Sequence, residues 1–359
     1  MSETAALARV EQALELAPIV DGHNDWAWES RLKHGSSVEG LEGPVDGDTD
    51  IIRLRAGRVG AQFWSVFVED EQAGPAAVAA TLEQIDWVHR LAARHPRDFM
   101  LARSAADIEA ARATGRIASL LGAEGAHSFD DSPGVLRMLA ALGVRYLTLT
   151  HNRNSAWADA ALDEPEHGGL TDRGRAYVRE LNRLGMLVDL SHVAPATMHT
   201  ALDVAAAPVV FSHSSCRALN DHPRNVPDDV LERLAGNGGV VMITFVPQFL
   251  SADYRAWFDG DRSGPSPVVT VADVADHIEH ARAVAGVRHI GLGSDFDGTD
   301  EFPQGLDGVD GYPELLAELA RRGWGAGDLA AVAGGNILRV LRETDAAFAG
   351  DRPPTALLL

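Results

Sequence analysis

Short, almost continuously apolar runs recur along the chain and alternate with longer stretches of helical periodicity. The runs are rich in Val, Ile and Leu, which is typical of strands that are buried on both faces of a parallel sheet. The pattern predicts eight strands, at residues 17–23, 60–68, 116–124, 144–151, 186–192, 208–214, 239–246 and 289–295.

The intervening stretches repeat apolar residues at three- and four-residue spacing and carry ordinary helix boundaries. One stretch stops at Pro96, and another begins at Thr171 or Asp172 and ends at Gly185. The predicted helices are 76–96, 171–185, 271–286, 312–322 and 326–345. Gly, Pro and Ser are frequent in 34–50 and 263–267, so both segments are predicted to be long loops.

Eight strands that alternate with helices predict a (β/α)8 barrel of the TIM type. A doubly wound open sheet is the alternative, but it usually carries a glycine-rich phosphate-binding motif after its first strand. Here the first predicted strand ends in "DGHND", which is no such motif. No domain boundary stands out, so residues 1–359 are predicted to form a single α/β domain.

The charge and composition of the chain indicate which classes of partner it can bind. The net charge of −21 disfavours nucleic acid and anionic membrane surfaces, which both require a basic face. Cys216 is the only cysteine, so no intrachain disulfide can form. The N-terminus lacks a signal-peptide pattern, no apolar run is long enough to span a membrane, and the terminal "TALLL" is too short for a lipid-anchor signal. We therefore expect a cytoplasmic protein; a homodimer is compatible with the sequence.

Six of the eight predicted strands end in a side chain that can bind a metal or transfer a proton. A lone histidine at a strand end is commonly a plain loop residue, and the chain has 14 histidines. The coincidence of six such strands at the end where barrel active sites lie favours a catalytic site. The residues are His23, Asp25, Glu124, His151, His192, His213 and Asp295.

Imidazole nitrogens and carboxylate oxygens are ligands that suit zinc and similar divalent ions. The donors exceed what one tetrahedral zinc needs, and they suit two metals that share a bridging carboxylate. Glu124, in the middle of the set, is the candidate bridge. A carboxylated lysine bridge is disfavoured, because the only lysine, Lys33, follows the first predicted strand in a loop.

The motifs that carry these residues resemble, in the same order, those of the renal (membrane) dipeptidase family of the amidohydrolase superfamily. They are "DGHND", "GAEGAH", "LTLTHN", "DLSH", "FSHSS", "HPRN" and "GSDFDG", and the resemblance runs from about residue 17 to about residue 345. It implies a zinc-dependent (β/α)8 barrel that hydrolyses dipeptides, including those with a D-residue at the C-terminal position.

The resemblance also implies roles for individual residues. His23 and Asp25 would hold one zinc, His192 and His213 the other, and Glu124 would bridge both. The resemblance further implies three groups that act on the substrate: His151, Arg224 and Asp295.

His151 would polarise the scissile carbonyl, and Arg224 would bind the free carboxylate of the substrate, which suits a planar guanidinium. Asp295 would accept a proton from the bridging water and pass it to the leaving amine, with Asp297 as a rival that more plausibly orders the loop. The chain departs from better-known members in lacking the signal, the lipid anchor and the cysteine pairs. Phe245 stands near where some members place a tyrosine beside the substrate.

The sequence thus predicts a binuclear zinc dipeptidase that acts on small dipeptides through a metal-bridging hydroxide. One alternative is another amidohydrolase-type reaction, on a lactone, cyclic amide or phosphoester. The other is a metal-free binding protein built on the same barrel.

Overall fold

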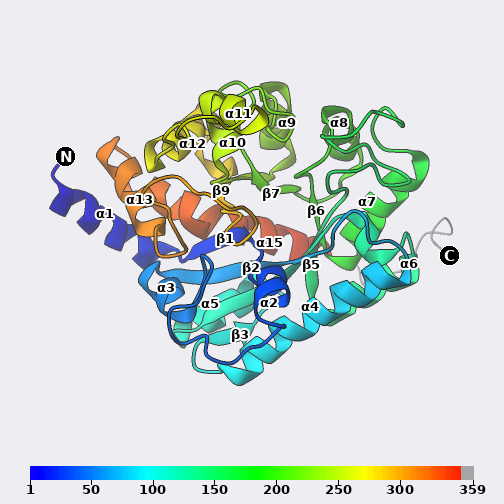
Figure 1. Ribbon diagram of the computed structural model, residues 1–359, viewed down its shortest axis with the longest axis horizontal. Helices are drawn as coiled ribbons and strands as arrows, with labels where there is room; N and C mark the ends of the chain where they lie inside the picture. Colours follow the sequence, from blue (N-terminus) through cyan, green and yellow to red (C-terminus); the bar gives the residue numbers. More distant parts are fainter. Residues whose placement is uncertain (349–359) are drawn as a thin grey trace.

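Parallel strands close into a ring in the computed structural model, which describes residues 1–348 (Figure 1). Ring closure follows from the pairing of β1 with both β2 and β9, and of β2 with β4. The eight ring strands are β1 Ile19–Asn24, β2 Val59–Phe67, β4 Ile117–Glu124, β5 Val144–Thr148, β6 Leu187–Asp189, β7 Val210–Ser214, β8 Val240–Ile243 and β9 Ile290–Leu292. The predicted strands and the predicted (β/α)8 barrel are confirmed.

A ninth strand, β3 (Phe99–Leu101), was not predicted and pairs with β4 outside the ring. The register of the ring brings the carboxyl ends of distant strands together. Phe67 at the end of β2 lies opposite Glu124 at the end of β4. Because all pairings are parallel, the residues that follow each strand gather at one rim.

Helices surround the ring in the part of the chain that the structure describes (Figure 1). They are α1 Glu3–Leu16, α2 Trp26–Lys33, α3 Ile51–Ala56, α4 Pro75–Arg94, α5 Ala105–Ala113, α6 Pro133–Leu142, α7 Asp172–Leu184, α8 Pro195–Val204, α9 Asp228–Asn237, α10 Pro247–Leu250, α11 Ala252–Asp259, α12 Val271–Ala285, α13 Tyr312–Arg321, α14 Ala326–Ala330 and α15 Asn336–Ala347. Short helical turns lie at η1 Ala126–Phe129, η2 Val287–His289 and η3 Ala331–Gly335.

All five predicted helices are present, and capping residues define the start of α7 and of α12. Thr171 accepts a hydrogen bond from the backbone N–H of Gly174, and Gly185 ends α7 in the left-handed conformation. Thr270 and Asp273 form a capping box at the start of α12. The predicted helix 326–345 is divided by η3 into α14 and α15.

Helix α1 was not predicted; it lies beside α13 at one edge of the barrel (Figure 1). Residues 34–50 and 263–267 are loops, as predicted. Lys33 closes α2 rather than lying in a loop, and its amine pairs with Glu29 one turn earlier.

Among residues 1–348, no helix has the length and apolar character that crossing a membrane requires. Residues 349–359, which include the predicted end of the domain and the terminal "TALLL", lie outside the described residues.

Candidate metal centre

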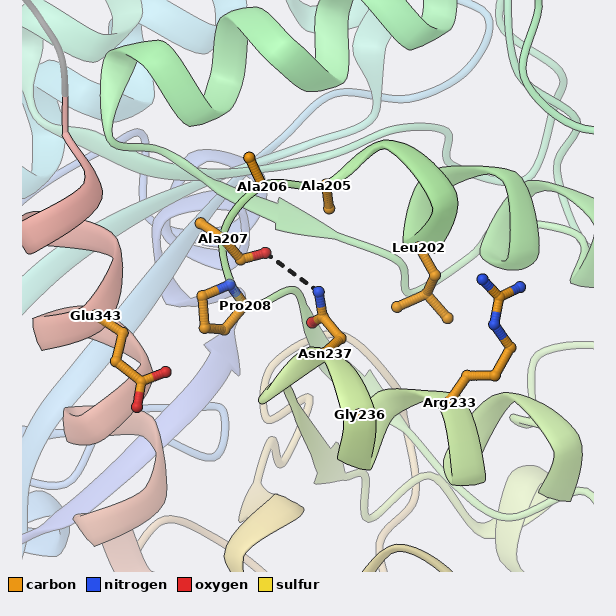
Figure 2. Close-up of a pocket in the computed structure, with 9 residues that line it drawn as sticks. All are labelled: Leu202, Ala205, Ala206, Ala207, Pro208, Arg233, Gly236, Asn237 and Glu343. Atoms are coloured by element: carbon orange, nitrogen blue, oxygen red, sulfur yellow. Dashed lines mark hydrogen bonds between the residues drawn. The ribbon is translucent and has the colours of Figure 1, made fainter.

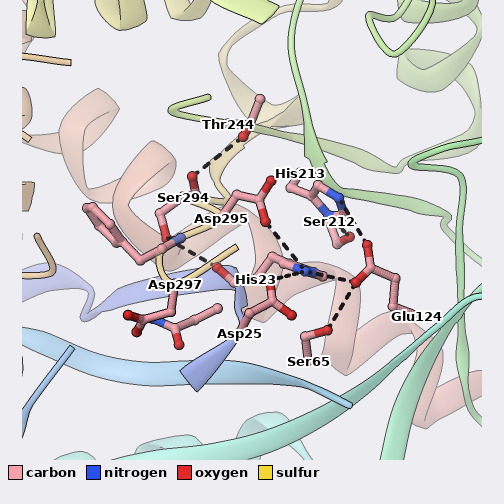
Figure 3. Close-up of polar contacts among 12 residues, drawn as sticks. His23, Asp25, Ser65, Glu124, Ser212, His213, Thr244, Ser294, Asp295 and Asp297 are labelled. Carbon is pink, nitrogen blue, oxygen red and sulfur yellow. Dashed lines mark hydrogen bonds and ion pairs between the residues drawn. The ribbon is translucent and has the colours of Figure 1, made fainter. Parts of the chain in front are cut away.

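The five predicted metal ligands lie at the carboxyl rim of the barrel. Figure 3 shows four of them, which are His23, Asp25, Glu124 and His213. His23 lies in β1 and His213 in β7, while Glu124 is the last residue of β4. Asp25 follows β1 and His192 follows β6. All five are nearly inaccessible to solvent, so their polar atoms need partners within the centre.

The two oxygens of the Glu124 carboxylate face different histidines. Oε2 lies 3.4 Å from Nε2 of His23, which in turn lies 3.2 Å from Oδ2 of Asp25. Oε1 lies 2.9 Å from Nε2 of His192 and 3.4 Å from Nε2 of His213. Glu124 therefore stands between two groups of donors, each of which includes nitrogen.

Several buried polar atoms of these residues lack a hydrogen-bond partner, and a bound metal ion would satisfy them. Nε2 of His23 and Oδ1 of Asp25 are buried without a hydrogen-bond partner among the described residues. Nε2 of His192 lies only 2.8 Å from Nε2 of His213, so two nitrogens point at one another. Three overlapping triplets have ligand atoms within 4.8 Å of one another: His23, Glu124 and His213; Glu124, His151 and His192; His23, Asp25 and Asp295. The donor set suits divalent zinc.

The other ring nitrogen of each ligand histidine has a partner outside the centre. Nδ1 of His23 lies 2.8 Å from the Tyr146 hydroxyl. Nδ1 of His192 lies 3.2 Å from Oδ1 of Asn152, and Nδ1 of His213 lies 2.9 Å from Oγ of its neighbour Ser212. Such outer contacts fix the ring orientation and leave Nε2 for a metal.

Two buried aspartates support this arrangement, and sequence reasoning assigned neither a role. Asp189 accepts hydrogen bonds of 2.6 Å from the hydroxyls of Ser212 and Thr148. Asp21 accepts hydrogen bonds from Ser294 (2.7 Å) and Gln62 (2.8 Å). Their signal in the sequence was a carboxylate inside an otherwise apolar strand, where a buried charge requires dedicated partners.

The tyrosine that contacts His23 depends on a glycine in the neighbouring strand. A Cβ atom on Gly122 would lie 1.9 Å from Cζ of Tyr146. No side chain fits there, so β4 carries a glycine where the Tyr146 ring crosses it.

Asp295 and Asp297 follow β9 and behave differently. Oδ1 of Asp295 lies 3.8 Å from Nε2 of His23, and its side chain is 15% exposed. Oδ1 of Asp297 instead accepts a hydrogen bond of 2.7 Å from the backbone N–H of Asp48, whose side chain accepts one of 2.9 Å in return. Asp297 therefore ties the 34–50 loop to the β9 end, while Asp295 faces the centre. Both adopt the left-handed conformation, with φ of 70° and 62°, which aspartate tolerates better than most residues.

Arg224 reaches the same rim from the loop after β7. It is 2% exposed, and its guanidinium lies over the Phe249 ring at 5.2 Å. It donates long hydrogen bonds to Oγ of Ser214 (3.5 Å) and to the carbonyl of His213 (3.3 Å), and its Nε has no partner. No carboxylate among residues 1–348 pairs with it, so a buried cation retains free donors next to the centre.

Burial and mutual charge set the pKa values of the centre. Burial lowers the pKa of His192 and of His213 well below the usual range, so both rings are neutral, as metal ligation requires. Burial raises the pKa of Glu124, but the charge of His23 and the hydrogen bond from His192 outweigh it and hold that pKa well below normal. Burial raises the pKa of Asp295 to about 7, with Asp25 and Glu124 adding repulsion. Burial lowers the pKa of Arg224 to about 10.

His151 and two further residues, Phe245 and Cys216, complete the comparison with the sequence. His151 follows β5 and joins Glu124 and His192 in one of the triplets. Phe245 packs against Phe296 and Tyr312 in the core and is fully buried. Cys216 is buried against His277, with its Sγ 3.4 Å from that residue's carbonyl oxygen.

A cavity of about 580 Å³ opens beside His151. Another, of about 490 Å³, lies at the amino end of β7, away from the rim (Figure 2). Its lining is Leu202, Ala205, Ala206, Ala207, Pro208, Arg233, Gly236, Asn237 and Glu343. It holds none of the candidate residues, so the site lies at the carboxyl rim.

Comparison with known proteins identifies the family of the chain. A family model described as membrane dipeptidase (peptidase family M19) matches residues 7–352. An uncharacterized dipeptidase of Schizosaccharomyces pombe is 45% identical over 344 residues, which cover 91% of this chain and 81% of that protein. Dipeptidase aclJ of Aspergillus oryzae is 44% identical and covers 94% of this chain and 80% of that protein.

Solved structures share the fold. A metallopeptidase from Rhodobacter sphaeroides, crystallised with a phosphinate mimic of the dipeptide L-Ala-D-Ala, superposes with a TM-score of 0.81 at 26% identity. The match covers 91% of this chain and 99% of that one. The probable dipeptidase PvdM of Pseudomonas aeruginosa matches with a TM-score of 0.84 at 24% identity over 95% of this chain and 99% of that one.

Proposed function

Because the chain belongs to the membrane dipeptidase family, peptidase family M19, and is thus a metal-dependent dipeptidase, we propose that it works with two zinc ions. His23 and Asp25 hold one ion, His192 and His213 hold the other, and Glu124 bridges them. Free dipeptides, including those with a C-terminal D-residue, are the proposed substrates.

The main support for this proposal is that the two oxygens of the Glu124 carboxylate face different histidines. One oxygen faces His23 at 3.4 Å, and the other faces His192 at 2.9 Å. A carboxylate that only neutralised one cation would not need separate donor groups on its two oxygens. A pair of ions about 3.5–4 Å apart does need a ligand of this kind.

Zinc ions in these positions would lower the pKa of a shared water enough to supply a nucleophile near neutral pH, and would polarise the scissile carbonyl. Asp295 faces the same place and has a pKa of about 7. A carboxylate with that pKa accepts the proton of the attacking water and returns it to the leaving amine at neutral pH. His151, which belongs to the triplet with Glu124 and His192, would polarise the carbonyl oxygen.

Arg224 is the reason why we expect the substrate to carry a free carboxylate. Its guanidinium is buried, positively charged and without a carboxylate partner among residues 1–348. A charge in such a place is costly until a ligand compensates it. A substrate carboxylate would form the bidentate pair that guanidinium favours.

This arrangement recognises a dipeptide by its carbonyl and its carboxylate, so it places little demand on the configuration of the second residue. The similar Rhodobacter sphaeroides enzyme binds a mimic of L-Ala-D-Ala, which supports the same tolerance here. Phe245, where a tyrosine would otherwise approach the substrate, is buried in the core and makes no such contact.

A panel of L,L- and L,D-dipeptides, assayed with the zinc-loaded protein, tests the proposal. We expect hydrolysis of both kinds at comparable rates, and near two zinc ions per chain by elemental analysis. Lactones, cyclic amides and phosphoesters serve as the comparison substrates. Preferential turnover of any of these would replace the dipeptide assignment, and strict L,L selectivity would remove the stereochemical part. A chain that binds no metal would be the barrel binding protein instead. The cytoplasmic location and the homodimer remain predictions.

A further inference from the structure

His151 is held by an acidic residue that lies outside the predicted site. Asp70 belongs to the loop between β2 and α4, and its Oδ2 lies 2.8 Å from Nδ1 of His151. The side chains are only 10% and 14% exposed. The contact is therefore a largely desolvated charge-assisted hydrogen bond, which is stronger than a similar bond on the surface.

Two aromatic contacts restrict the same ring. The Phe67 ring, at the end of β2, meets it edge-on with centroids 4.8 Å apart. The ring of His192 lies on another side at 4.6 Å. With Nδ1 bonded to Asp70, Nε2 is the nitrogen of His151 without a hydrogen-bond partner among residues 1–348. His151 is one of the residues that line the cavity of about 580 Å³.

The chemistry of a carboxylate fixes which partner donates in the contact between Asp70 and His151. An ionised carboxylate only accepts hydrogen bonds, so the bond to Asp70 places a proton on Nδ1. The tautomer with its only proton on Nε2 would set the Nδ1 lone pair against the carboxylate and is disfavoured. When Nε2 donates to a substrate oxygen, the ring carries two protons, and the Asp70 carboxylate balances the resulting charge.

We propose that Asp70 is the positioning residue of His151: it fixes the ring so that Nε2 points at the scissile carbonyl. This inference rests on the proposed dipeptidase function and adds a residue to it. Among residues 1–348, no hydrogen bond or ion pair joins Asp70 to a donor atom of the metal ligands. It acts through His151, as the buried aspartate of a catalytic triad acts through its histidine.

The same loop supplies a matched control. Glu71, the next residue, pairs at 2.8 Å with Arg153, and both side chains are more than 60% exposed. Exposed pairs of this kind contribute little. Glu71→Gln therefore removes one negative charge from the loop without touching His151, whereas Asp70→Asn removes the charge that His151 contacts and introduces an amide that can bind Nδ1 in either orientation.

The experiment measures kcat and KM on one good dipeptide, zinc content and unfolding temperature for four proteins besides the wild type: Asp70→Asn, Glu71→Gln, His151→Gln and the Asp70→Asn/His151→Gln double variant. We expect Asp70→Asn to lower kcat roughly 10- to 100-fold with a much smaller change in KM, somewhat below the loss expected for removing an oxyanion donor. Glu71→Gln should stay within about twofold of the wild type. In the His151→Gln background the Asp70 substitution should cost less than about twofold, because residues that act as a unit are not additive.

Each outcome distinguishes the inference from the function on which it rests. Unchanged kcat in Asp70→Asn, an effect confined to KM, or full additivity in the double variant would overturn the positioning role while leaving the dipeptidase intact. Loss of zinc or a lowered unfolding temperature in Asp70→Asn would make the role structural and would also overturn it. A wild-type protein that hydrolyses no dipeptide would instead remove the proposed function.

Discussion

Nε2 of His192 lies 2.9 Å from Oε1 of Glu124, and both side chains are less than 10% exposed. One residue ends β4 and the other follows β6, so this contact exists only when the barrel closes. The relationship makes Glu124 the residue on which the proposed two-metal centre depends.

Glu124→Gln tests that dependence. A neutral amide cannot compensate two cations, so the variant should lose most bound zinc and nearly all activity. Elemental analysis and a dipeptide assay measure both. Glu109→Gln, an exposed glutamate of α5 that pairs with Arg342, is the control and should match the wild type. A Glu124→Gln protein that kept two zinc ions and full turnover would show that the ligand assignment is wrong.

Tyr146→Phe tests the outer contact of His23. The substitution keeps the ring that crosses Gly122 but removes the hydroxyl 2.8 Å from Nδ1 of His23. Loss of such a partner typically weakens metal binding about 10- to 100-fold, which a competition titration with a chelator measures. Tyr177→Phe removes a hydroxyl that donates to the carbonyl of Asp131 and should leave zinc affinity unchanged. Equal affinities in all three proteins would exclude an orienting role.

Arg224→Met tests recognition of the substrate carboxylate. The loss should fall mainly on dipeptides with a free carboxylate, while C-terminal amides, which offer no anion, should change little from their already poor turnover. Arg262 also lies over an aromatic ring, at 3.9 Å from the Phe258 centroid, but is exposed, so Arg262→Met is the matched control. If free dipeptides and amides lost activity equally, Arg224 would not be the carboxylate site.

Asp295→Asn tests the proton transfer. The variant should retain both zinc ions, because its ligand sets are otherwise complete, yet its kcat should fall by about 10²-fold or more. The acidic limb of the pH–rate profile should change as well, since a carboxyl with a pKa of about 7 is replaced. Asp300→Asn, an exposed aspartate of the same loop, should behave as the wild type. Full zinc together with full rate in Asp295→Asn would refute the shuttle.

Asp297 gives a prediction about stability. Burial and then the charge of Asp48 raise the pKa of Asp297 to about 7, far above its value of about 3.9 in an unfolded chain. A raised pKa means that the folded state binds the proton more tightly than the unfolded chain does. The resulting contribution of Asp297 to the free energy of unfolding is fully present below about pH 4 and is lost as the pH rises through about 7. Asp297→Asn removes this pH-dependent loss of stability, while the Oδ1 of the amide can still accept the hydrogen bond from the backbone N–H of Asp48.

The free energy of unfolding of zinc-loaded Asp297→Asn should therefore fall less between pH 5 and 8 than that of the wild type, by on the order of 2 kcal/mol. Denaturant melts at the two pH values measure the difference. Parallel pH dependences for the two proteins would mean that the Asp297 carboxyl is not perturbed in the folded state.

The strands of the ring and the candidate residues at their ends were predictable, because both depend on local sequence. A buried parallel strand must be apolar along its length, so His23, Glu124 and His213 stood out as polar groups at the ends of apolar runs. Helix α7 was predictable for the same reason, since Thr171 and Gly185 satisfy its ends locally.

Other features depend on contacts between segments and had no local signal. Strand β3 has three residues and exists because β4 offers it an edge. The hydroxyl of Tyr146 and the carboxylate of Asp70 come from segments whose sequences do not indicate that they approach histidines.

The sequence by itself determined the barrel, its order of strands and the side chains that reach its carboxyl rim, because strand burial and parallel pairing send every strand end to that rim. The tertiary structure alone decided how those side chains face one another: that Glu124 divides its oxygens between His23 and His192, that Asp295 faces the centre while Asp297 binds Asp48, and that Asp70 holds His151. Such choices depend on the register of the strands and on loop packing over distances of a few ångströms, which no periodicity along the chain encodes.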